Sequence, residues 1–349
     1  MKTPAFWSEP NFLSRLLKPL GTVYAFATRL RIGLGRPCKI GRPVVCIGNL
    51  TAGGTGKTPV AAAVAGLLQQ AGKNPFFVSR GYGGTLKNIM VDKEKYTASE
   101  VGDEPLLLAR RAPVIVNPDR VAGAQKALRS GAEVIVMDDG FQHRYVEAKI
   151  NVVLIDATRP VQEDRMLPLG SLRDVPGQLH RAHYFIVTKC PEEMNPLDRR
   201  IMRKVLIEAA YQNIYFTRME AFRPQPVFGE APAEGFDPGT EVILMSGIGN
   251  PAQFVRGASA CYRVVGELRF EDHHVYRVKD LKTLAGLIAQ HPAAMVLTTE
   301  KDAVKLAGRG KVPAEIRSRL FYQPINISFI DDSATDFLQN LEKDVKSDS

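Results

Sequence analysis

Short apolar runs recur along the chain, and each is followed by polar or glycine-rich residues and then by a longer mixed segment. A continuous apolar run is typical of a strand buried on both faces, whereas a long mixed segment with helical spacing favours a helix. These patterns predict strands within residues 44–50, 73–84, 113–120, 133–144, 151–158 and 182–189, and helices at 60–72, 101–112 and 121–131. Such alternation predicts an α/β fold with a doubly wound, mostly parallel sheet.

The same pattern resumes after a change in composition. Residues 223–239 are rich in proline and glycine, which is typical of a linker between domains. Beyond them, strand-and-turn patterns return within residues 241–254, 263–276 and 293–306. We therefore expect a larger domain at 38–225 and a smaller α/β domain at 226–349.

The first 37 residues form a separate region with a different pattern. Apolar residues between 12 and 30 are interspersed with Arg15, Lys18 and Arg29, and Trp7 precedes them. This segment has too many charges to span a bilayer. An apolar helix with basic ends suits the headgroup region of a membrane, so we expect residues 1–37 to lie on a membrane surface. The alternative is an amphipathic helix packed on the protein's own sheet.

Charge and cysteine content narrow the classes of partner. Lys and Arg number 46 against 37 Asp and Glu, which gives a net charge of +9 and favours anionic partners such as nucleotides, nucleic acid or acidic lipid. The four cysteines, Cys38, Cys46, Cys190 and Cys261, show no C-x-x-C spacing. Their distribution argues against a zinc site or a disulfide framework and favours a reducing compartment. We expect no cleavable signal peptide.

The segment TAGGTGKT at residues 51–58 resembles a phosphate-binding loop, although Thr51 stands where the strict pattern has glycine. It lies between an expected strand and an expected helix, which is the context that this motif needs. Gly53, Gly54 and Gly56, with Thr55 between them, would let backbone N–H groups surround phosphate oxygens. Lys57 would reach the β- and γ-phosphates, and the Thr58 hydroxyl would face Mg²⁺.

A second acidic element follows the apolar strand at 133–137. Asp138 and Asp139 come directly after this strand, about 80 residues beyond the loop, where a carboxylate holds Mg²⁺ directly or through water. No clean N-K-x-D sequence for reading guanine is present, so we expect ATP. Asp302 in the T-E-K-D run could contact a base, but a helix cap formed with Thr299 explains the same residues.

Transfer of a phosphoryl group to an alcohol needs a group that takes the hydroxyl proton. The candidates are Asp103 and Glu104, at the start of an expected helix, and the adjacent His273 and His274 in FEDHHVY. Each pair also has a structural interpretation, because carboxylates favour helix N-termini and surface histidines are common. Arginines in the loops after strands could bind phosphate, and each alone is more often a surface ion-pair partner; these are Arg80, Arg120 and Arg173.

Seven segments taken in order resemble one family, the tetraacyldisaccharide 4′-kinases of Gram-negative bacteria. These segments are GNLTAGGTGKTP, SRGYGG, VGDEP, DDGFQHR, LPLGSLRD, FEDHHVY and TTEKDAVK, spread over residues 48–305. The resemblance implies ATP- and Mg²⁺-dependent transfer of the γ-phosphate to the 4′-hydroxyl of tetraacyldisaccharide 1-phosphate, giving lipid IVA in lipid A biosynthesis. It also implies a location at the cytoplasmic face of the inner membrane.

The resemblance further implies roles for individual residues. Asp103 would pair with His273 to activate the acceptor hydroxyl, with Glu104 in support, and Arg173 would meet phosphate. Asp138 and Asp139 would lie near Mg²⁺, and Gln142 and His143 near the nucleotide. Asp174 stands where the family has glutamate, one methylene longer, and would be a further metal contact.

Two other classes of protein remain compatible with the phosphate loop. One is a nucleotide-dependent switch or metallochaperone-like protein, which would use the loop to change conformation. The other is a soluble kinase of a small metabolite, which would make no use of a membrane helix. For the lipid kinase, we expect a monomer that binds the membrane surface and no nucleic acid.

Overall fold

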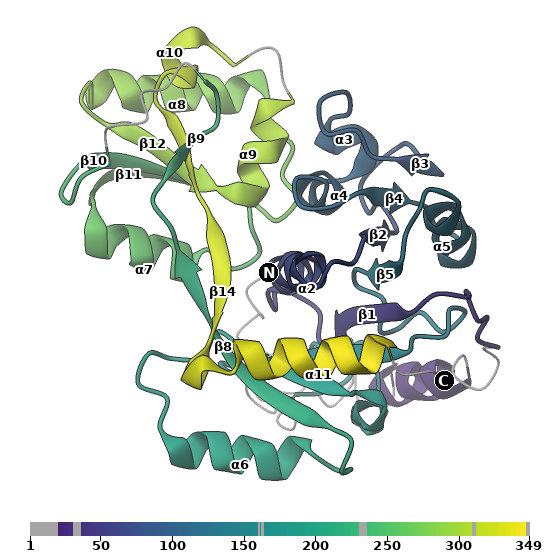
Figure 1. Cartoon of the computed structure of the whole chain (residues 1–349). Coiled ribbons are helices and arrows are strands. Elements are labelled where there is room, and N and C mark those ends of the chain that lie inside the picture. Colours follow the sequence, from purple (N-terminus) through teal and green to yellow (C-terminus); the bar gives the residue numbers. More distant parts are fainter. Residues whose placement is uncertain are drawn as a thin grey trace.

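The computed structural model describes residues 20–30, 36–159, 161, 164–229, 236–308 and 312–346. They fold into two α/β domains that lie side by side, with the larger domain built on a nine-stranded sheet (Figure 1). The order across this sheet is β14-β8-β7-β6-β1-β5-β2-β4-β3. Only the edge strands β14 and β3 run antiparallel to their neighbours. The expected doubly wound, mostly parallel sheet is confirmed.

The strands of the large sheet coincide with the predicted apolar runs and extend to three further segments. Their bounds are β1 Val44–Asn49, β2 Pro75–Ser79, β3 Ile89–Met90, β4 Val114–Val116, β5 Val134–Met137, β6 Ile150–Asp156, β7 Tyr184–Thr188, β8 Asn213–Ala221 and β14 Ile325–Phe329. The central strands β1, β5, β6 and β7 are buried along their whole length. Their unbroken apolar character therefore follows from helices on both faces of the sheet.

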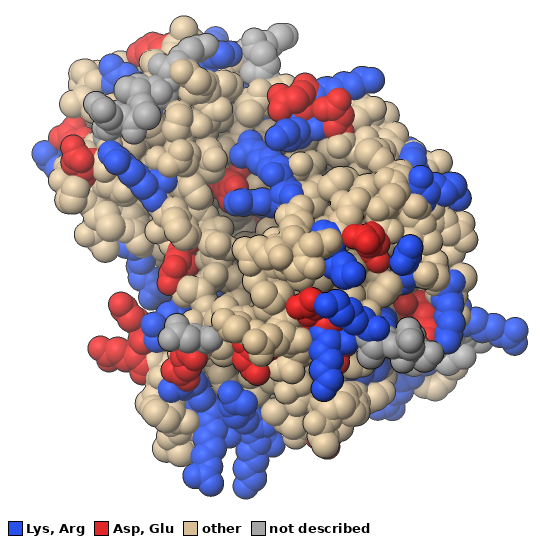
Figure 2. Space-filling view, in the orientation of Figure 1, with Lys and Arg blue, Asp and Glu red and all other residues tan. Residues whose placement is uncertain are grey.

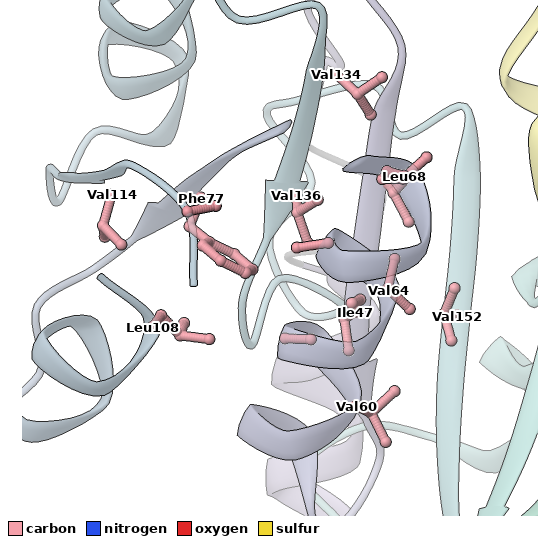
Figure 3. Close-up of a cluster of buried hydrophobic side chains, with 14 of the residues drawn as sticks. Ile47, Val60, Val64, Leu68, Phe77, Leu108, Val114, Val134, Val136 and Val152 are labelled. Atoms are coloured by element: carbon pink, nitrogen blue, oxygen red, sulfur yellow. The ribbon is translucent and has the colours of Figure 1, made fainter. Parts of the chain in front are cut away.

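Helices cover the two faces of the large sheet around separate core clusters. The helices of this domain are α2 Lys57–Gln70, α3 Ala98–Val101, α4 Asp103–Leu108, α5 Arg120–Arg129, α6 Pro196–Leu206 and α11 Ala334–Lys346, with a 3₁₀ turn at Pro176–Arg181. In Figure 3, Val60, Val64 and Leu68 of α2 project from one side of the helix toward the strands. This packing places the first residue of α2, Lys57, at the carboxyl edge of the sheet.

The smaller domain has a five-stranded sheet of its own, in the order β11-β10-β12-β13-β9. Its elements are β9 Gln225–Pro226, β10 Glu241–Ser246, α7 Ala252–Cys261, β11 Arg263–Arg269, α8 Val278–Gln290, β12 Met295–Thr299, α9 Glu300–Ala307, α10 Ala314–Arg317 and β13 Leu320–Gln323. All its strand pairs are parallel except β13 with β9. The expected second α/β fold is thus present.

The end of the chain returns to the larger domain, contrary to the expected boundary at 226–349. Strand β14 pairs with β8, and Phe337, Leu341 and Val345 of α11 lie in the core beside α2. Figure 1 shows the two connections between the domains, β8 to β9 and β13 to β14, running alongside each other. Residues 325–346 therefore belong with the first domain. The Pro/Gly-rich segment 223–239 also contributes β9 to the second sheet.

Of the expected 1–37 segment, the structure describes residues 20–30, which are helical, and residues 36–37; residues 1–19 and 31–35 lie outside the described ranges. Leu20, Val23, Phe26 and Leu30 are exposed on this helix. Within the described ranges, no helix combines the length and the apolar character needed to cross a bilayer.

Candidate functional site

The carboxyl ends of strands from the larger domain border a cavity of about 1510 Å³ between the two domains. In Figure 2 the surface is hollowed between the domains, and charged side chains gather around this recess. The cavity is lined by many of the residues that the sequence analysis singled out: Gly53, Gly54, Thr55, Gly56, Lys57, Thr58, Glu104, Asp138, Asp139, Gln142, His143, Arg173 and His273. Distant segments of the chain therefore converge on one site.

The glycine loop precedes α2 and leaves the start of this helix open. Gly53 and Gly56 have φ values of 109° and 86°, a region that side chains disfavour. Gly56 is the N-cap of α2 and offers no side-chain cap to the first N–H groups. The free N–H groups of a helix start, together with its dipole, bind anions such as phosphate. Thr51 is not among the residues with positive φ, so this position of the loop accepts a side chain.

Residues at the end of β7 hold the backbone of the glycine loop in place. Thr188 donates a hydrogen bond from Oγ1 to the carbonyl oxygen of Thr55 at 2.8 Å. Lys189 donates from Nζ to the carbonyl oxygen of Gly54 at 2.5 Å and pairs with Asp156 at 2.6 Å. The sequence analysis assigned no role to Lys189. In the structure its ammonium holds the loop that would surround the phosphates.

Lys57, Asp139 and Arg173 form a connected charged group in the cavity. Lys57 Nζ lies 3.7 Å from Asp139 Oδ1, and the Arg173 guanidinium binds both Asp139 oxygens at 2.8 and 3.1 Å. Burial alone would raise the pKa of Asp139, but the Arg173 hydrogen bonds and the Lys57 charge lower it to about 2. Asn49 links the two cations, because its Oδ1 accepts from Lys57 at 3.3 Å and from Arg173 at 2.6 Å.

Asp138 has the surroundings of a cation ligand. Its side chain is buried, and its Oδ1 has no hydrogen-bond partner among the residues that the structure describes. Burial, together with the charges of Glu104 and Asp139, raises the pKa of Asp138 to about 7. A buried carboxylate oxygen without a partner fits a hard divalent cation such as Mg²⁺. Within the described ranges, no three His, Cys, Asp or Glu residues cluster as a metal site; Mg²⁺ bound with phosphates needs only one or two carboxylates.

Two residues expected in this region have other roles. Asp174 is buried but is absent from the cavity lining; it pairs with Arg144 at 3.4 Å and accepts the backbone N–H of Val175 at 2.9 Å. In this structure the Asp174 carboxylate is turned into the protein, and this position does not favour the metal contact expected for it. Arg120 lines the cavity but donates to the carbonyl oxygens of Val78 and Asp138, which ties two strand ends together.

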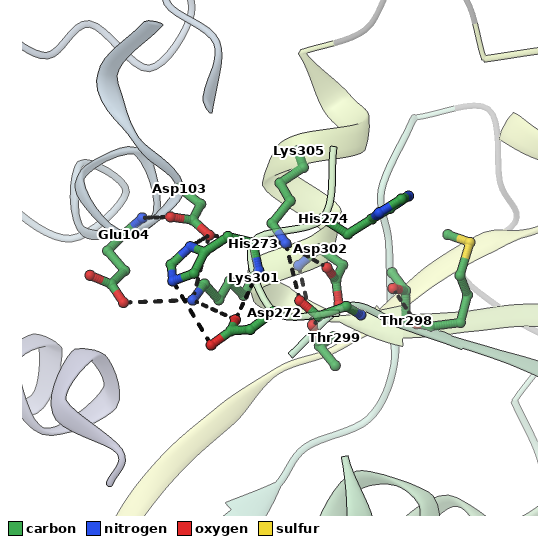
Figure 4. Close-up of polar contacts among 12 residues, drawn as sticks. Asp103, Glu104, Asp272, His273, His274, Thr298, Thr299, Lys301, Asp302 and Lys305 are labelled. Atoms are coloured by element: carbon green, nitrogen blue, oxygen red, sulfur yellow. Dashed lines mark hydrogen bonds and ion pairs between the residues drawn. The ribbon is translucent and has the colours of Figure 1, made fainter. Parts of the chain in front are cut away.

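Across the cavity, Asp103 and His273 form the expected pair (Figure 4). Asp103 opens α4 in the larger domain, and His273 follows β11 in the smaller one; Asp103 Oδ2 lies 3.1 Å from His273 Nδ1. Burial by itself would raise the pKa of Asp103, but the hydrogen bond with His273 and the charge of Lys301 hold it well below its usual range. The Asp103 hydrogen bond in turn raises the pKa of His273.

The neighbouring histidine has a structural role. His274 Nε2 lies 3.0 Å from Asp280 Oδ2 in the first turn of α8, and its ring is stacked on Phe270 with 4.4 Å between ring centroids. The structural interpretation of the two histidines is therefore correct for His274. It does not apply to His273, which faces the cavity.

Lys301, at the start of α9, was missed by the sequence analysis. Its Nζ lies 3.3, 3.5 and 3.6 Å from carboxylate oxygens of Asp272, Asp103 and Glu104. Burial alone would lower the pKa of Lys301, but these carboxylates raise it. The available signal was a lysine two residues after a strand that ends beside the cavity. The T-E-K-D run was considered only for its aspartate and for the cap formed with Thr299.

Asp302 supports the helix start that carries this lysine. Its backbone N–H donates to Thr299 Oγ1 at 3.2 Å, and its carboxylate accepts the Gly247 N–H at 2.9 Å. Asp302 is fully buried in these contacts. Of the two interpretations that the sequence left open, the helix cap is the one observed.

Comparison with known proteins agrees with this geometry. The family model for tetraacyldisaccharide-1-P 4′-kinase matches residues 13–345. Proteins named tetraacyldisaccharide 4′-kinase match over most of both chains. That of Phocaeicola vulgatus is 32% identical over 97% of this chain and 96% of its own. That of Nitrobacter winogradskyi is 38% identical over 90% of each. A crystal structure of LpxK from Aquifex aeolicus in complex with ATP superposes with a TM-score of 0.74, at 25% identity, covering 96% of this chain and 100% of that one.

Proposed function

Since the chain belongs to the tetraacyldisaccharide-1-P 4′-kinase family, we propose how the residues around its cavity carry out the reaction. The protein is an ATP-dependent kinase of lipid A biosynthesis, which transfers the γ-phosphate to the 4′-hydroxyl of tetraacyldisaccharide 1-phosphate. The observation that carries our assignment is the convergence of a phosphate loop and the Asp103–His273 pair on one cavity.

The nucleotide is held on the side of the larger domain. The loop glycines and the start of α2 receive the phosphates, and Lys57 meets the β- and γ-phosphates. Thr58, Asp138 and Asp139 would hold Mg²⁺, which supplies neutralisation of the phosphate charge when bound. Gln142 and His143 border the nucleotide; Gln142 also donates to the Asn49 carbonyl oxygen at 2.7 Å.

Arg173 acts beside these groups on the transferred phosphoryl group. Its guanidinium is aligned by Asp139, so its position is fixed before substrate binds. A planar guanidinium offers paired N–H donors to phosphate oxygens, which suits charge that spreads over the oxygens in the transition state. Glu104, from the larger domain, also lines the cavity, and its carboxylate contacts Lys301 of the smaller domain at 3.6 Å.

The acceptor hydroxyl is activated by the pair formed across the domains. As the oxygen of the 4′-hydroxyl bonds to the γ-phosphorus, the bond to the β-phosphate oxygen breaks and ADP leaves. The hydroxyl proton passes to the Asp103–His273 pair, and the imidazole carries it because the pKa of Asp103 is held low. Asp103 orients the ring and stabilises the imidazolium that forms.

Lys301 is a positioning residue in this scheme. Its ammonium contacts Asp103, Asp272 and Glu104, so it fixes the carboxylate that orients the histidine. Because Lys301 and His273 both belong to the smaller domain, the active pair forms only when the two domains have this relative placement. Lys305, one turn further along α9, pairs with Asp302 at 2.9 Å.

The acceptor stays in a bilayer through its acyl chains, so the site must come to the membrane surface. We place the protein at the cytoplasmic face of the inner membrane, as a monomer, with the N-terminal 37 residues in contact with lipid. The exposed Leu20, Val23, Phe26 and Leu30 support this placement. Deletion of residues 1–34 should weaken activity on membrane-embedded acceptor much more than it weakens ATP binding, and an equal loss of both would contradict it.

The test of the whole assignment is transfer of radiolabelled γ-phosphate from ATP to tetraacyldisaccharide 1-phosphate in mixed micelles. Lipid-borne label with the wild type, and none with Asp103→Ala or Lys57→Ala, is the expected result. ATP hydrolysis that depends on Lys57 without any labelled lipid would instead support a nucleotide-dependent switch.

A further inference from the structure

Helix α6 presents an apolar stripe to solvent. Leu197, Ile201 and Val205 follow one another at intervals of four residues, and 63%, 52% and 47% of their surfaces are exposed. Residues at this spacing lie on one side of a helix. The stripe therefore runs along most of α6, over about 12 Å at 1.5 Å per residue.

The orientation of α6 is fixed by its other side, so the stripe cannot turn toward the core. Leu206 is buried and Met202 packs against the core cluster on this face of the large sheet. Arg203 lies over the Phe216 ring, with 5.5 Å to its centroid, and Arg199 forms an ion pair with Asp331. The apolar residues outside are thus a stable feature of the surface.

Basic side chains border the stripe. Arg200 and Lys204 are exposed next to it, and the acidic residue of the helix, Asp198, lies in its first turn. Figure 2 shows Lys and Arg side chains projecting at the lower edge of the molecule, where α6 lies in Figure 1. Cations beside an exposed apolar stripe complement a surface that is anionic outside and apolar beneath.

The helix at residues 20–30 exposes a second set of apolar side chains on the same side of the large sheet. Gly21 of this helix lies against Leu169 and Met166, and Met166 packs on the same core cluster as Met202 of α6. In Figure 1 both helices lie along the lower side of the sheet. A lipid surface can receive the exposed apolar side chains of both helices without a shape-specific fit.

We propose that α6 is a membrane-contacting helix, which inserts Leu197, Ile201 and Val205 among the acyl chains while Arg200 and Lys204 bind anionic phospholipid headgroups. The proposal rests on the proposed function in one respect, namely that the acceptor is a lipid held in a bilayer. Long basic side chains reach the headgroups from a helix that lies in the interface. Contact at α6, added to contact at the N-terminal region, would hold the protein in one orientation on the membrane.

The experiment is co-sedimentation of the full chain with vesicles of phosphatidylcholine, with and without phosphatidylglycerol. The stripe variant combines Leu197→Gln, Ile201→Gln and Val205→Gln, since glutamine keeps a good helix propensity. We expect its affinity for the anionic vesicles to fall about tenfold or more. The charge variant Arg200→Gln with Lys204→Gln should lose about tenfold on anionic vesicles and change little on phosphatidylcholine alone.

The matched control replaces two exposed apolar residues elsewhere, Met90→Gln with Val278→Gln, and should bind vesicles as the wild type does. Equal vesicle affinity of the wild type and the stripe variant would overturn the proposal, as would an equal loss in this control. If the stripe variant binds vesicles normally but loses self-association in analytical ultracentrifugation, the stripe is a protein interface and the proposal is also wrong.

A kinase assay separates this proposal from the proposed function. With acceptor dispersed in detergent micelles, the stripe variant should retain the wild-type rate, because α6 lies outside the cavity. With acceptor in anionic vesicles, its rate should fall in step with its vesicle affinity. A wild type that labels no lipid in either setting would refute the kinase assignment and leave the vesicle binding result to be judged on its own.

Discussion

Lys301 and Asp103 form an ion pair across the two domains, with 3.5 Å between Nζ and Oδ2. The same ammonium reaches Asp272 at 3.3 Å, in the loop that carries His273. One partly buried cation thus fixes both the carboxylate and the loop of the histidine in the catalytic pair. This arrangement turns the relative placement of the domains into a condition for catalysis.

Replacement of Lys301 by methionine should lower kcat by about 100-fold, the cost of a misplaced catalytic group. Loss of the positive charge also favours the protonated pair, so the pKa of His273 should rise and the acidic limb of the kcat/KM profile should move to higher pH. Lys301→Arg should restore part of the rate, and Lys282→Met, at an exposed position of α8, should change neither quantity. An unshifted pH profile in Lys301→Met would contradict the positioning role.

The rate should increase as pH rises through the pKa of His273, because only a neutral imidazole can receive the hydroxyl proton. Asp103 raises this pKa above its ordinary value, although Lys301 opposes it. In Asp103→Asn the main cause of the increase is gone, so the acidic limb should move to lower pH while the maximum rate falls. The measurement is kcat/KM against pH for both proteins, and a limb at the same pH in both would argue against the pair.

Stability should depend on pH through the same contact. A histidine whose folded pKa is raised stabilises the fold below its unfolded pKa, and this contribution is lost as pH rises through the folded value. His273 is more than a third exposed, so solvent screening keeps the effect small, at most about 1 kcal/mol. Urea unfolding of the wild type and His273→Gln should therefore differ more at acidic than at alkaline pH; the opposite order would be inconsistent with the raised pKa.

Substitutions at the two adjacent histidines should differ in effect, with His273 affecting activity and His274 affecting stability. His274→Asn removes the stacking on Phe270 and should destabilise the smaller domain by about 1 kcal/mol while kcat remains near the wild-type value. His273→Asn should have the reverse effect, with a large loss of kcat and a small change in stability. Thermal unfolding combined with steady-state kinetics measures both quantities. Equal losses of kcat in the two variants would remove the distinction.

Asp138 and Asp174 should differ in their effect on Mg²⁺. Asp138→Asn should weaken the apparent Mg²⁺ affinity by about tenfold or more, because a ligand oxygen loses its charge. Asp174→Asn should leave that affinity unchanged and reduce stability, since its carboxylate faces Arg144. Titration of activity with Mg²⁺ at saturating ATP measures the apparent affinity of both variants. An equal loss of Mg²⁺ affinity in Asp174→Asn would support the metal contact first expected for that residue.

The sequence by itself determined the parts of the protein that depend on local chemistry. A phosphate loop needs glycines at Gly53 and Gly56, an adjoining strand and a following helix, and all of these lie within about thirty consecutive residues. Strands buried on both faces must be apolar, so the α/β class was visible in the apolar runs. The family resemblance supplied the Asp103–His273 pair, which no local pattern could have matched across 170 residues.

Tertiary structure alone decided what depends on packing between distant segments. Lysine is a common surface residue type, and only the approach of α9 to α4 brings Lys301 among carboxylates. Asp174 follows Arg173 directly, yet the Arg173 side chain binds Asp139 in the cavity and the Asp174 side chain binds Arg144 in the protein interior. The direction in which the backbone points each side chain therefore decides its role more than its residue type does. The return of β14 and α11 to the first sheet likewise follows from the core that Phe337 and Leu341 fill, a long-range gain in apolar burial that local spacing does not record.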